Sequence, residues 1–257
     1  RRGIAKYLGK KFFYPKFGPG QMWEEVAKDI EGMGGTILME HELVRFATRD
    51  GKIVSARVRN VASGEESDID ADYFCSTMPI KELLTSMEAD IPEDVQYVGT
   101  NLEYRDFLTV GVLLRKLDAH EPDGSLIRDN WIYIQEPGVK MGRIQIFNNW
   151  SPYLVKDKDT VWVGLEYFAT EGDALWNLNE EELKELGIKE LVEMGLAKKE
   201  DVIDSVVIKI KKTYPGYFGT YKDFGVVRTF IDQFSNLFLI GRNGMHKYNN
   251  QDHSMLT

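Results

Sequence analysis

The C-terminal segment holds the side chains best suited to bind a polar cofactor or ligand. An apolar run over 237–240 ends in Gly-Arg-Asn-Gly at 241–244, and amides, rings and an acid follow. Glycine lets a ligand approach the backbone closely, and Arg242 offers a fixed fork of donors for a phosphate, carboxylate or carbonyl. The amides at 249–251 suit a heterocycle or a ribose. An ordinary polar loop in which Arg242 pairs with a structural acid explains the pattern equally well.

Two further segments could contact phosphate groups. Tyr214 precedes Pro215 in a predicted loop, where its phenol could donate to phosphate oxygens or simply pack against the proline. Gly18-Pro19-Gly20 precedes a predicted helix, whose free N–H groups would favour an anion. The residue three after Gly20 is Trp23 rather than glycine, so the dinucleotide fingerprint fails. We therefore interpret this second segment as a helix start.

The sequence predicts no metal site, and it does not identify a catalytic residue. His246 and His253 lie seven residues apart with Asp252 beside them, and no cysteine or second acid lies nearby to complete a ligand set. Neither a Gly-x-Ser-x-Gly nor a His-Glu-x-x-His motif occurs in the chain.

Composition narrows the class of protein. The chain has 257 residues, of which 43% are hydrophobic, and a net charge of -9, which argues against a nucleic-acid or anionic-membrane partner. It has no uninterrupted apolar run of about 18 residues, so we expect no membrane span. One cysteine, Cys75, excludes an internal disulfide and favours a cytoplasmic setting. We expect Cys75 to be a small core residue.

Hydrophobic periodicity predicts an α/β fold with α+β character. Its first part reads as a helix that Gly34-Gly35 ends, a hairpin around Asp50-Gly51, a short strand and a second helix. The strands are expected at 36–47, 52–61 and 72–76, and the second helix at 79–87.

From about residue 92 the pattern becomes rich in β-branched and aromatic residues, which predicts a mostly antiparallel sheet. The β-rich segments are 95–114, 131–147, 160–168 and 202–211, with one or two charged helices over 180–196 and a helix over 224–234. This order is typical of an α/β domain with an inserted second domain. The predicted boundaries are 1–90 with 215–257 for the first domain and 91–214 for the insert.

Four blocks of the sequence resemble a known superfamily. They are residues 13–24, residues 76–79, residues 142–152 taken with 164–168, and residues 241–255. The chain is similar to the FAD-dependent amine oxidases and protoporphyrinogen-oxidase-like proteins, on the branch close to UDP-galactopyranose mutase. The resemblance implies an FAD-binding Rossmann-like domain, present here in part, with an inserted β-sheet domain for the substrate.

The resemblance also implies roles for individual residues. The Gly-Arg-x-Gly loop would lie at the flavin, and two tyrosines from separate segments would close on one substrate diphosphate. The implied cofactor residues are Gly241, Arg242, Gly244 and Asn250, and the implied substrate residues are Tyr214, Tyr248, His246 and Arg143. His246 stands where the mutase has a tyrosine, and Asn250 stands where it has an acid.

Two departures shape the functional hypothesis. The amino-terminal Gly-x-Gly-x-x-Gly unit, which holds the main FAD pyrophosphate site, is absent, as is a helix after the C-terminal loop. We therefore expect a fragment of an FAD-dependent oxidoreductase or mutase-like enzyme that acts on a small molecule such as a UDP-sugar. We expect the full-length protein to bind FAD, and this fragment to bind it weakly or not at all and to be inactive alone. The alternative is a non-catalytic ligand-binding module derived from such an enzyme. The sequence leaves the oligomeric state open.

Overall fold

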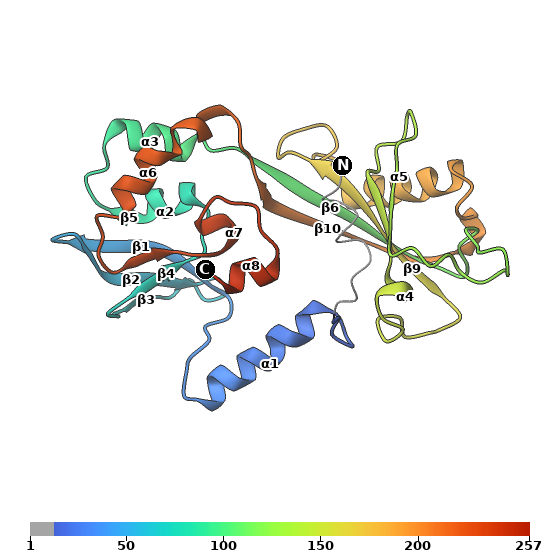
Figure 1. Cartoon of the computed structure of the whole chain (residues 1–257), viewed down its shortest axis with the longest axis horizontal. Coiled ribbons are helices and arrows are strands. Elements are labelled where there is room, and N and C mark those ends of the chain that lie inside the picture. The colour runs from blue at the N-terminus through green and yellow to red at the C-terminus, as the bar shows by residue number, and fades with distance from the viewer. Residues whose placement is uncertain (1–12) are drawn as a thin grey trace, which may run out of the picture. The chain divides into compact units, whose positions relative to one another are not determined.

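The computed structural model of the chain describes residues 13–257, which form two compact units (Figure 1). Unit 1 contains the described residues up to Ile37 together with Leu108–Phe168 and Ala174–Lys209. Unit 2 contains Leu38–Phe107, Ala169–Asp173 and Ile210–Thr257. The assignment of a cofactor role and a substrate role to predicted domains 1–90 with 215–257 and 91–214 remains a prediction.

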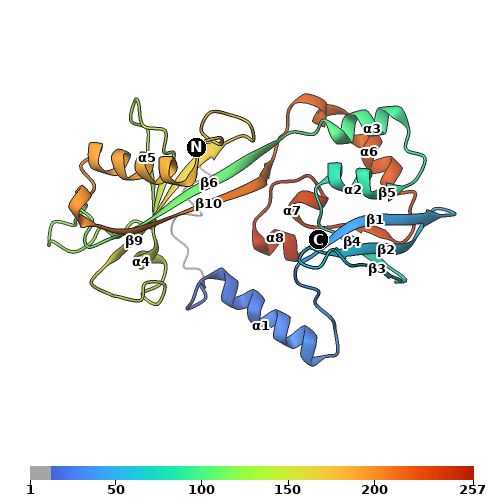
Figure 2. The same ribbon diagram turned by 180° about the vertical axis from the view of Figure 1, so that it is seen from behind.

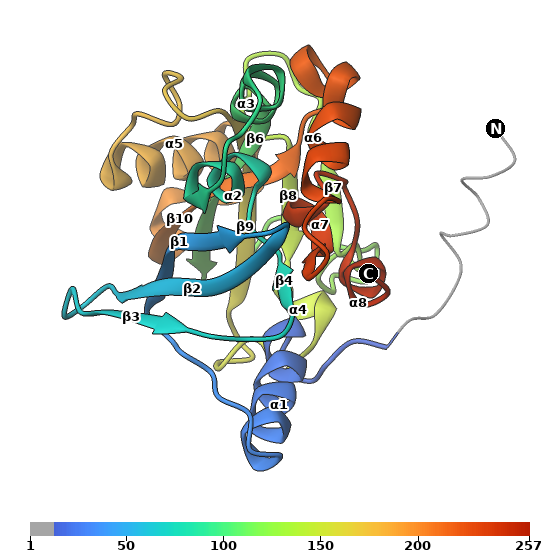
Figure 3. The ribbon, with the colours of Figure 1, turned by 90° about the vertical axis from the view of Figure 1, so that its left-hand side faces the viewer.

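Unit 2 is built on a four-stranded sheet in the order β3-β2-β1-β5. β1 (His41–Arg49), β2 (Lys52–Asn60) and β3 (Glu66–Ile69) pair antiparallel and lie side by side in Figure 3, and β5 (Met87–Glu88) pairs parallel with β1. The hairpin between β1 and β2 turns at Asp50-Gly51, both with positive φ, as the sequence predicts. The first strand begins at His41 rather than at Thr36.

A second sheet of unit 2 has two parallel strands, β4 (Phe74–Ser76) and β11 (Leu237–Leu239). Cys75 is exposed, so its expected place in the core is wrong. Because side chains alternate along a strand, the burial of Phe74 and Ser76 turns the thiol between them outward.

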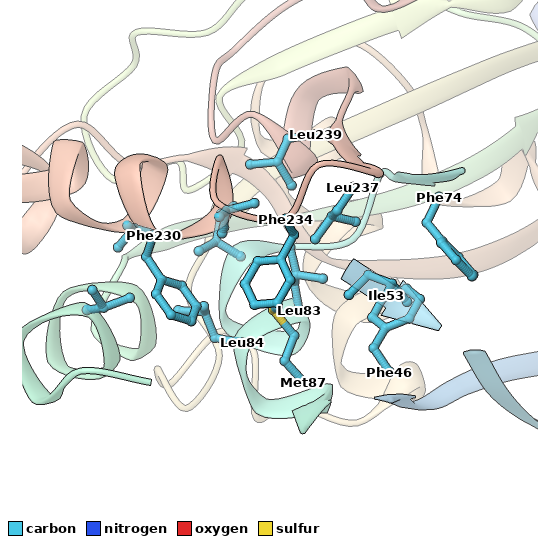
Figure 4. Packing of buried hydrophobic residues seen from close by; sticks show 14 of the residues in the cluster. Phe46, Ile53, Phe74, Leu83, Leu84, Met87, Phe230, Phe234, Leu237 and Leu239 are labelled. Carbon is cyan, nitrogen blue, oxygen red and sulfur yellow. The ribbon is translucent and has the colours of Figure 1, made fainter. Parts of the chain in front are cut away.

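The core of unit 2 joins these strands to three helices. α2 (Ile80–Ser86), α3 (Glu93–Thr100) and α6 (Phe224–Ile231) supply aliphatic and aromatic side chains that meet those of the sheets (Figure 4). A 3-10 turn, η3 (Gly219–Asp223), leads into α6. Burial of large apolar side chains is the main favourable term in folding, so this cluster fixes the base from which the C-terminal loop extends.

The helix α3 corrects one prediction. The β-rich segment expected over 95–114 begins as a helix and becomes strand β6 (Tyr104–Leu114) only afterwards. Pro92 stands at the N-cap with Glu93 and Asp94 in the first turn, which are signals of a helix start. Val95, Val98 and Gly99 are buried at helical spacing. The two β-branched valines therefore lie on the buried face of a helix and not in a strand.

Unit 1 contains most of a five-stranded sheet in the order β10-β6-β9-β8-β7. The sheet consists of β6, β7 (Trp131–Tyr133), β8 (Arg143–Ile146), β9 (Val161–Ala169) and β10 (Val202–Pro215). β7 pairs antiparallel with β8, and β8 with β9, as predicted for the insert. The chain passes between the two units within β6, β9 and β10, and also after Ile37 and after Asp173.

The helix α5 (Glu180–Glu193) covers one face of this sheet (Figure 2). Asn179 and Glu182 form a capping box at its start. Its Leu183 and Leu191 pack with buried side chains of β6, β8 and β9. Gly187 faces the sheet, and a Cβ there would lie 2.9 Å from a methyl of Leu165. Short helices α4 (Phe147–Trp150) and η2 (Lys199–Asp201) flank strands β8 and β10.

The helix α1 (Pro19–Gly32) begins where the sequence predicts a helix start. Gly18 is the N-cap with φ of 87°, and Pro19 occupies the first helical position. This geometry explains the glycine and proline without a phosphate ligand. The segment before the helix is held inside unit 1, because Ser151 Oγ donates to the Lys16 carbonyl at 2.7 Å.

Candidate functional site

The C-terminal loop follows β11 directly, as the sequence predicts. It consists of α7 (Gly241–Gly244), an irregular stretch and α8 (Gln251–Met255). Gly244 lies against the backbone of β4, where an added Cβ would be 2.3 Å from the Ser76 carbonyl oxygen. The Ile240 N–H also donates to that oxygen at 3.0 Å. Two of the sequence blocks singled out above therefore meet at a contact that only glycine permits.

Arg242 ties the loop to the end of β10. Its Nε and Nη2 donate to the carbonyl of Asn249 at 3.0 and 2.5 Å, and its Nη1 donates to the carbonyl of Thr213 at 3.0 Å. These acceptors are backbone carbonyls rather than the structural acid that the sequence left open as an alternative. Because carbonyls do not neutralise a guanidinium, its positive charge stays in the site.

Two tyrosines from separate segments stack beside this guanidinium. The rings of Tyr214 and Tyr248 lie 5.8 Å apart at an interplanar angle of 22°. The Arg242 guanidinium carbon lies 4.7 Å from the centre of the Tyr248 ring and 5.7 Å from that of Tyr214. The Tyr248 N–H donates to the Tyr217 hydroxyl at 2.6 Å. The structure thus brings together the phenols that the sequence places 34 positions apart.

His246 joins the two segments that carry these tyrosines. Its side chain is fully buried, with 0% exposure, and φ is 45°. Nε2 donates to the Gly216 carbonyl at 2.9 Å, since a carbonyl can only accept, and Nδ1 then accepts from the Tyr104 hydroxyl at 3.1 Å. Burial lowers the pKa of His246 and raises the pKa of Tyr104 to about 12, so both stay neutral. The ring therefore connects the loop after Tyr214 to the loop before Tyr248.

A pocket of about 430 Å³ opens along the same loop. Its walls include Met245, Tyr248, Asn249, Asn250 and His253. Asn250 is exposed at the N-cap of α8, and its N–H donates to His253 Nδ1 at 3.5 Å. The pocket has the size of a small-molecule site and offers amide groups on an otherwise largely apolar wall.

Arg143 belongs to unit 1 and stands on β8. It faces Glu166 across the antiparallel pair of β8 and β9. Nε donates to Glu166 Oε2 at 2.5 Å, Nη2 forms an ion pair with the same oxygen, and Gln145 Nε2 donates to Oε1. Arg143 thus sits in a cluster of its own, which holds a carboxylate that the sequence analysis did not single out.

Sequence reasoning missed the supporting residues. Tyr104 supports the loop through its hydroxyl, and nothing in its local sequence distinguishes it from a core tyrosine. Tyr217 lies in the loop after Tyr214, where the sequence places phenols, but its bond to the Tyr248 N–H could not be predicted. Glu166 could have been found, because antiparallel pairing of the two predicted strands around it places a glutamate opposite an arginine.

Among residues 13–257, no three His, Cys, Asp or Glu side chains gather closely enough to hold a metal ion. His246 is buried, whereas His253 is exposed beside Asp252. Within the same range, no helix combines the length and apolar character needed to cross a membrane.

Comparison with known proteins gives matches to solved structures alone. No protein-family model and no curated protein sequence matches the chain. Reduced UDP-galactopyranose mutase matches with 19% identity and a TM-score of 0.76, covering 95% of this chain and 50% of that one. A protein assigned provisionally as a protoporphyrinogen oxidase from Exiguobacterium sp. matches with 16% identity and a TM-score of 0.66, covering 93% and 49%.

An oxidoreductase from Methanosarcina mazei matches with 17% identity and a TM-score of 0.59, covering 90% of this chain and 50% of that one. The chain therefore spans about half the length of the solved structures it matches. At these identities the likeness concerns the fold. The resemblance inferred from the four sequence blocks is confirmed at that level: the chain has the fold of one half of UDP-galactopyranose mutase and of these oxidoreductases.

Proposed function

We propose that this chain is part of a flavin enzyme, mutase-like or oxidase-like, whose substrate is a nucleotide sugar. The observation that carries the proposal is the stacked pair Tyr214 and Tyr248 with the Arg242 guanidinium against the rings. Phenol hydroxyls donate to phosphate oxygens, and a nearby fixed cation favours an anion over a neutral ligand. The two rings lie 5.8 Å apart, so one diphosphate can accept a hydrogen bond from each phenol.

The negative net charge of the chain makes the positive charge of Arg242 important for binding a diphosphate. The chain carries a net charge of -9, so a diphosphate is repelled by the molecule as a whole and needs a local cation. Arg242 supplies that cation, and its three hydrogen bonds hold it in one orientation. A preformed donor arrangement loses less entropy when a ligand binds.

The residues present also fit a flavin. The pocket beside Tyr248 offers the exposed amide of Asn250 and an apolar wall, which suit a ring system with polar edges. Asn250 would hold the group, and a bound flavin would supply the redox or nucleophilic chemistry. His246 and Tyr104 keep the loop in place, and both remain neutral because they are buried.

The test is a calorimetric titration of the chain with UDP and with UDP-galactose. Hydrogen bonds to charged groups contribute about 1.5–3 kcal/mol, so Tyr214→Phe and Tyr248→Phe should each weaken binding by about tenfold or more. Tyr73→Phe is the matched control, because Tyr73 is an exposed tyrosine of the same unit. Binding of UDP that neither variant weakens would refute the diphosphate assignment. Nucleotide binding that does not depend on added flavin would favour the non-catalytic module.

A further inference from the structure

The strand β10 forms one edge of the five-stranded sheet. It is hydrogen-bonded to β6 on one side, and within the part of the chain that the structure describes no strand lies on its other side. It runs for 14 residues, whereas a typical strand has about five or six. A long edge strand presents backbone N–H and C=O groups that can pair with the strand of another molecule.

One face of β10 exposes large apolar side chains. Val206, Ile208 and Ile210 are 46%, 51% and 47% exposed, and their spacing of two residues places them on the same face. Val207 points to the opposite face and packs against the core that α5 covers. Edge strands are usually protected by charged side chains, so an exposed apolar stripe on such a strand indicates a pairing surface.

The two lysines of this stretch are bound within their own chain. Lys209 Nζ donates to the carbonyls of Trp176 and Leu178 at 2.6 and 2.8 Å. Lys211 Nζ forms an ion pair with Glu171. Both lysines alternate with the exposed apolar residues and therefore lie on the other face of the strand. They repel an incoming strand less than unbound edge lysines would.

We propose that β10 pairs antiparallel with β10 of a second copy of this chain, with Ile208 on the two-fold axis. In this register Val206 of each copy lies opposite Ile210 of the other, and Ile208 lies opposite itself. Asp204 comes opposite Lys212, so opposite charges flank the apolar centre at both ends. Directly opposed apolar pairs and oppositely charged pairs both stabilise antiparallel strands.

The same residues disfavour the neighbouring registers. If the axis moved to Val207, the carboxylate of Asp204 would lie opposite Ile210. If it moved to Lys209, that lysine would lie opposite its own copy. A carboxylate against an apolar side chain and two like charges against each other are both unfavourable. The self-complementary pattern is the reason for assigning the edge to a second copy.

The local structure at Lys212 limits the length of the pairing. Its φ is 54°, and its N–H donates to the Asp106 carboxylate at 2.7 Å, so the regular extended edge ends there. Its ammonium also contacts Glu82, but an ammonium has three donors and can bind a second carboxylate. Regular pairing thus covers residues 205–211. A contact of this size forms a weak, reversible dimer that needs neither flavin nor nucleotide, which takes the inference beyond the proposed function.

The first test is sedimentation equilibrium of the chain from micromolar to millimolar concentration. The mass should rise from 29.5 kDa toward twice that value. Ile208→Lys would place two ammonium groups opposite each other and should raise the dissociation constant by about tenfold or more. Ile69→Lys is the matched control, because Ile69 is 37% exposed on β3, an edge strand of the other large sheet, and it should leave the mass unchanged. Circular dichroism checks that both variants fold.

The second test is cross-linking, which reports the register. Cys75→Ser first removes the one thiol of the chain, which is exposed. In that background Ile208→Cys should give a disulfide-linked dimer under mild oxidation, because opposed Cβ atoms lie about 5 Å apart. Val206→Cys is the control, since the two copies of residue 206 would lie about 14 Å apart, four residues along the strand.

Three results would overturn the proposal. The first is the mass of a single chain at every concentration, and the second is a dimer that Ile208→Lys leaves as tight as before. The third is cross-linking of Val206→Cys as readily as of Ile208→Cys, which would contradict the register. Because none of these measurements involves UDP or a flavin, this proposal and the proposed function can fail separately.

Discussion

The substitution Gly244→Ala tests how the C-terminal loop is joined to the rest of unit 2. An added Cβ would lie 2.3 Å from the carbonyl oxygen of Ser76 and 3.3 Å from its carbonyl carbon. Real Cβ atoms essentially never come closer than 3.0 Å to another heavy atom, and a backbone carbonyl cannot rotate away as a side chain can. The two segments must therefore separate by about 0.7 Å.

That displacement acts on a hydrogen bond. The Ile240 N–H donates to the same Ser76 oxygen at 3.0 Å, at the end of the pair formed by β11 and β4. Lengthening it by 0.7 Å would take it beyond hydrogen-bond range, at a cost of about 1 kcal/mol. Overpacking adds about 1–3 kcal/mol, so we expect the free energy of unfolding to fall by about 2–4 kcal/mol.

Guanidinium denaturation followed by circular dichroism measures this loss. Gly225→Ala is the matched control, because Gly225 lies in α6 of the same unit and an added Cβ there meets nothing within 4 Å. Alanine is the better helix former, so the control should gain about 0.5–1 kcal/mol. A Gly244→Ala protein as stable as the control would refute the close contact between the loop and β4.

The remaining predictions concern buried groups and a cap. Because burial lowers the pKa of His246, the native state binds fewer protons than the unfolded state below pH 6.5, and the free energy of unfolding should fall on acidification. The loss is about 1.4 kcal/mol for each unit by which the pKa is lowered. A His246→Gln protein whose stability keeps the same pH dependence would show that His246 is not the group responsible. Tyr167→Phe removes a 2.9 Å hydrogen bond to the buried Glu190 and should lower the free energy of unfolding, measured by urea denaturation, by ~1–2 kcal/mol. A smaller loss would exclude a stabilising role for this hydrogen bond. Asn179→Ala breaks the capping box with Glu182 and should cost about 1 kcal/mol by the same assay, whereas an unchanged midpoint would exclude the cap.

Local sequence signals were enough for most of the elements. The pair Asp50-Gly51 predicts the hairpin, and Gly18 with Pro19 predicts the start of α1, because each depends on the conformations that single residues allow. The helix α3 was missed because Val95 and Val98 favour strands, while their burial against α2 and α6 decides for a helix. Tertiary packing is not visible in a short window of sequence.

In the candidate site too, the local features could be predicted from the sequence, whereas the tertiary contacts could not. The glycine-arginine loop after an apolar strand could be recognised, because close backbone approach needs glycine at a defined position. The bonds of Arg242 to two carbonyls could not be predicted, since they depend on where the end of β10 lies. The burial of His246 could not be predicted either, because the sequence of a polar loop does not show whether its histidine faces a binding site or the protein interior.

The proposed function makes this chain part of a flavin enzyme that holds a nucleotide sugar between Tyr214 and Tyr248. An absorbance spectrum of the protein, purified with added FAD and then titrated with UDP-galactose, tests this proposal. We expect a flavin band that shifts on addition of the nucleotide sugar, and a much smaller shift at the same ligand concentration in Tyr248→Phe. A protein that takes up no flavin, or a band that UDP-galactose leaves unchanged, would contradict it.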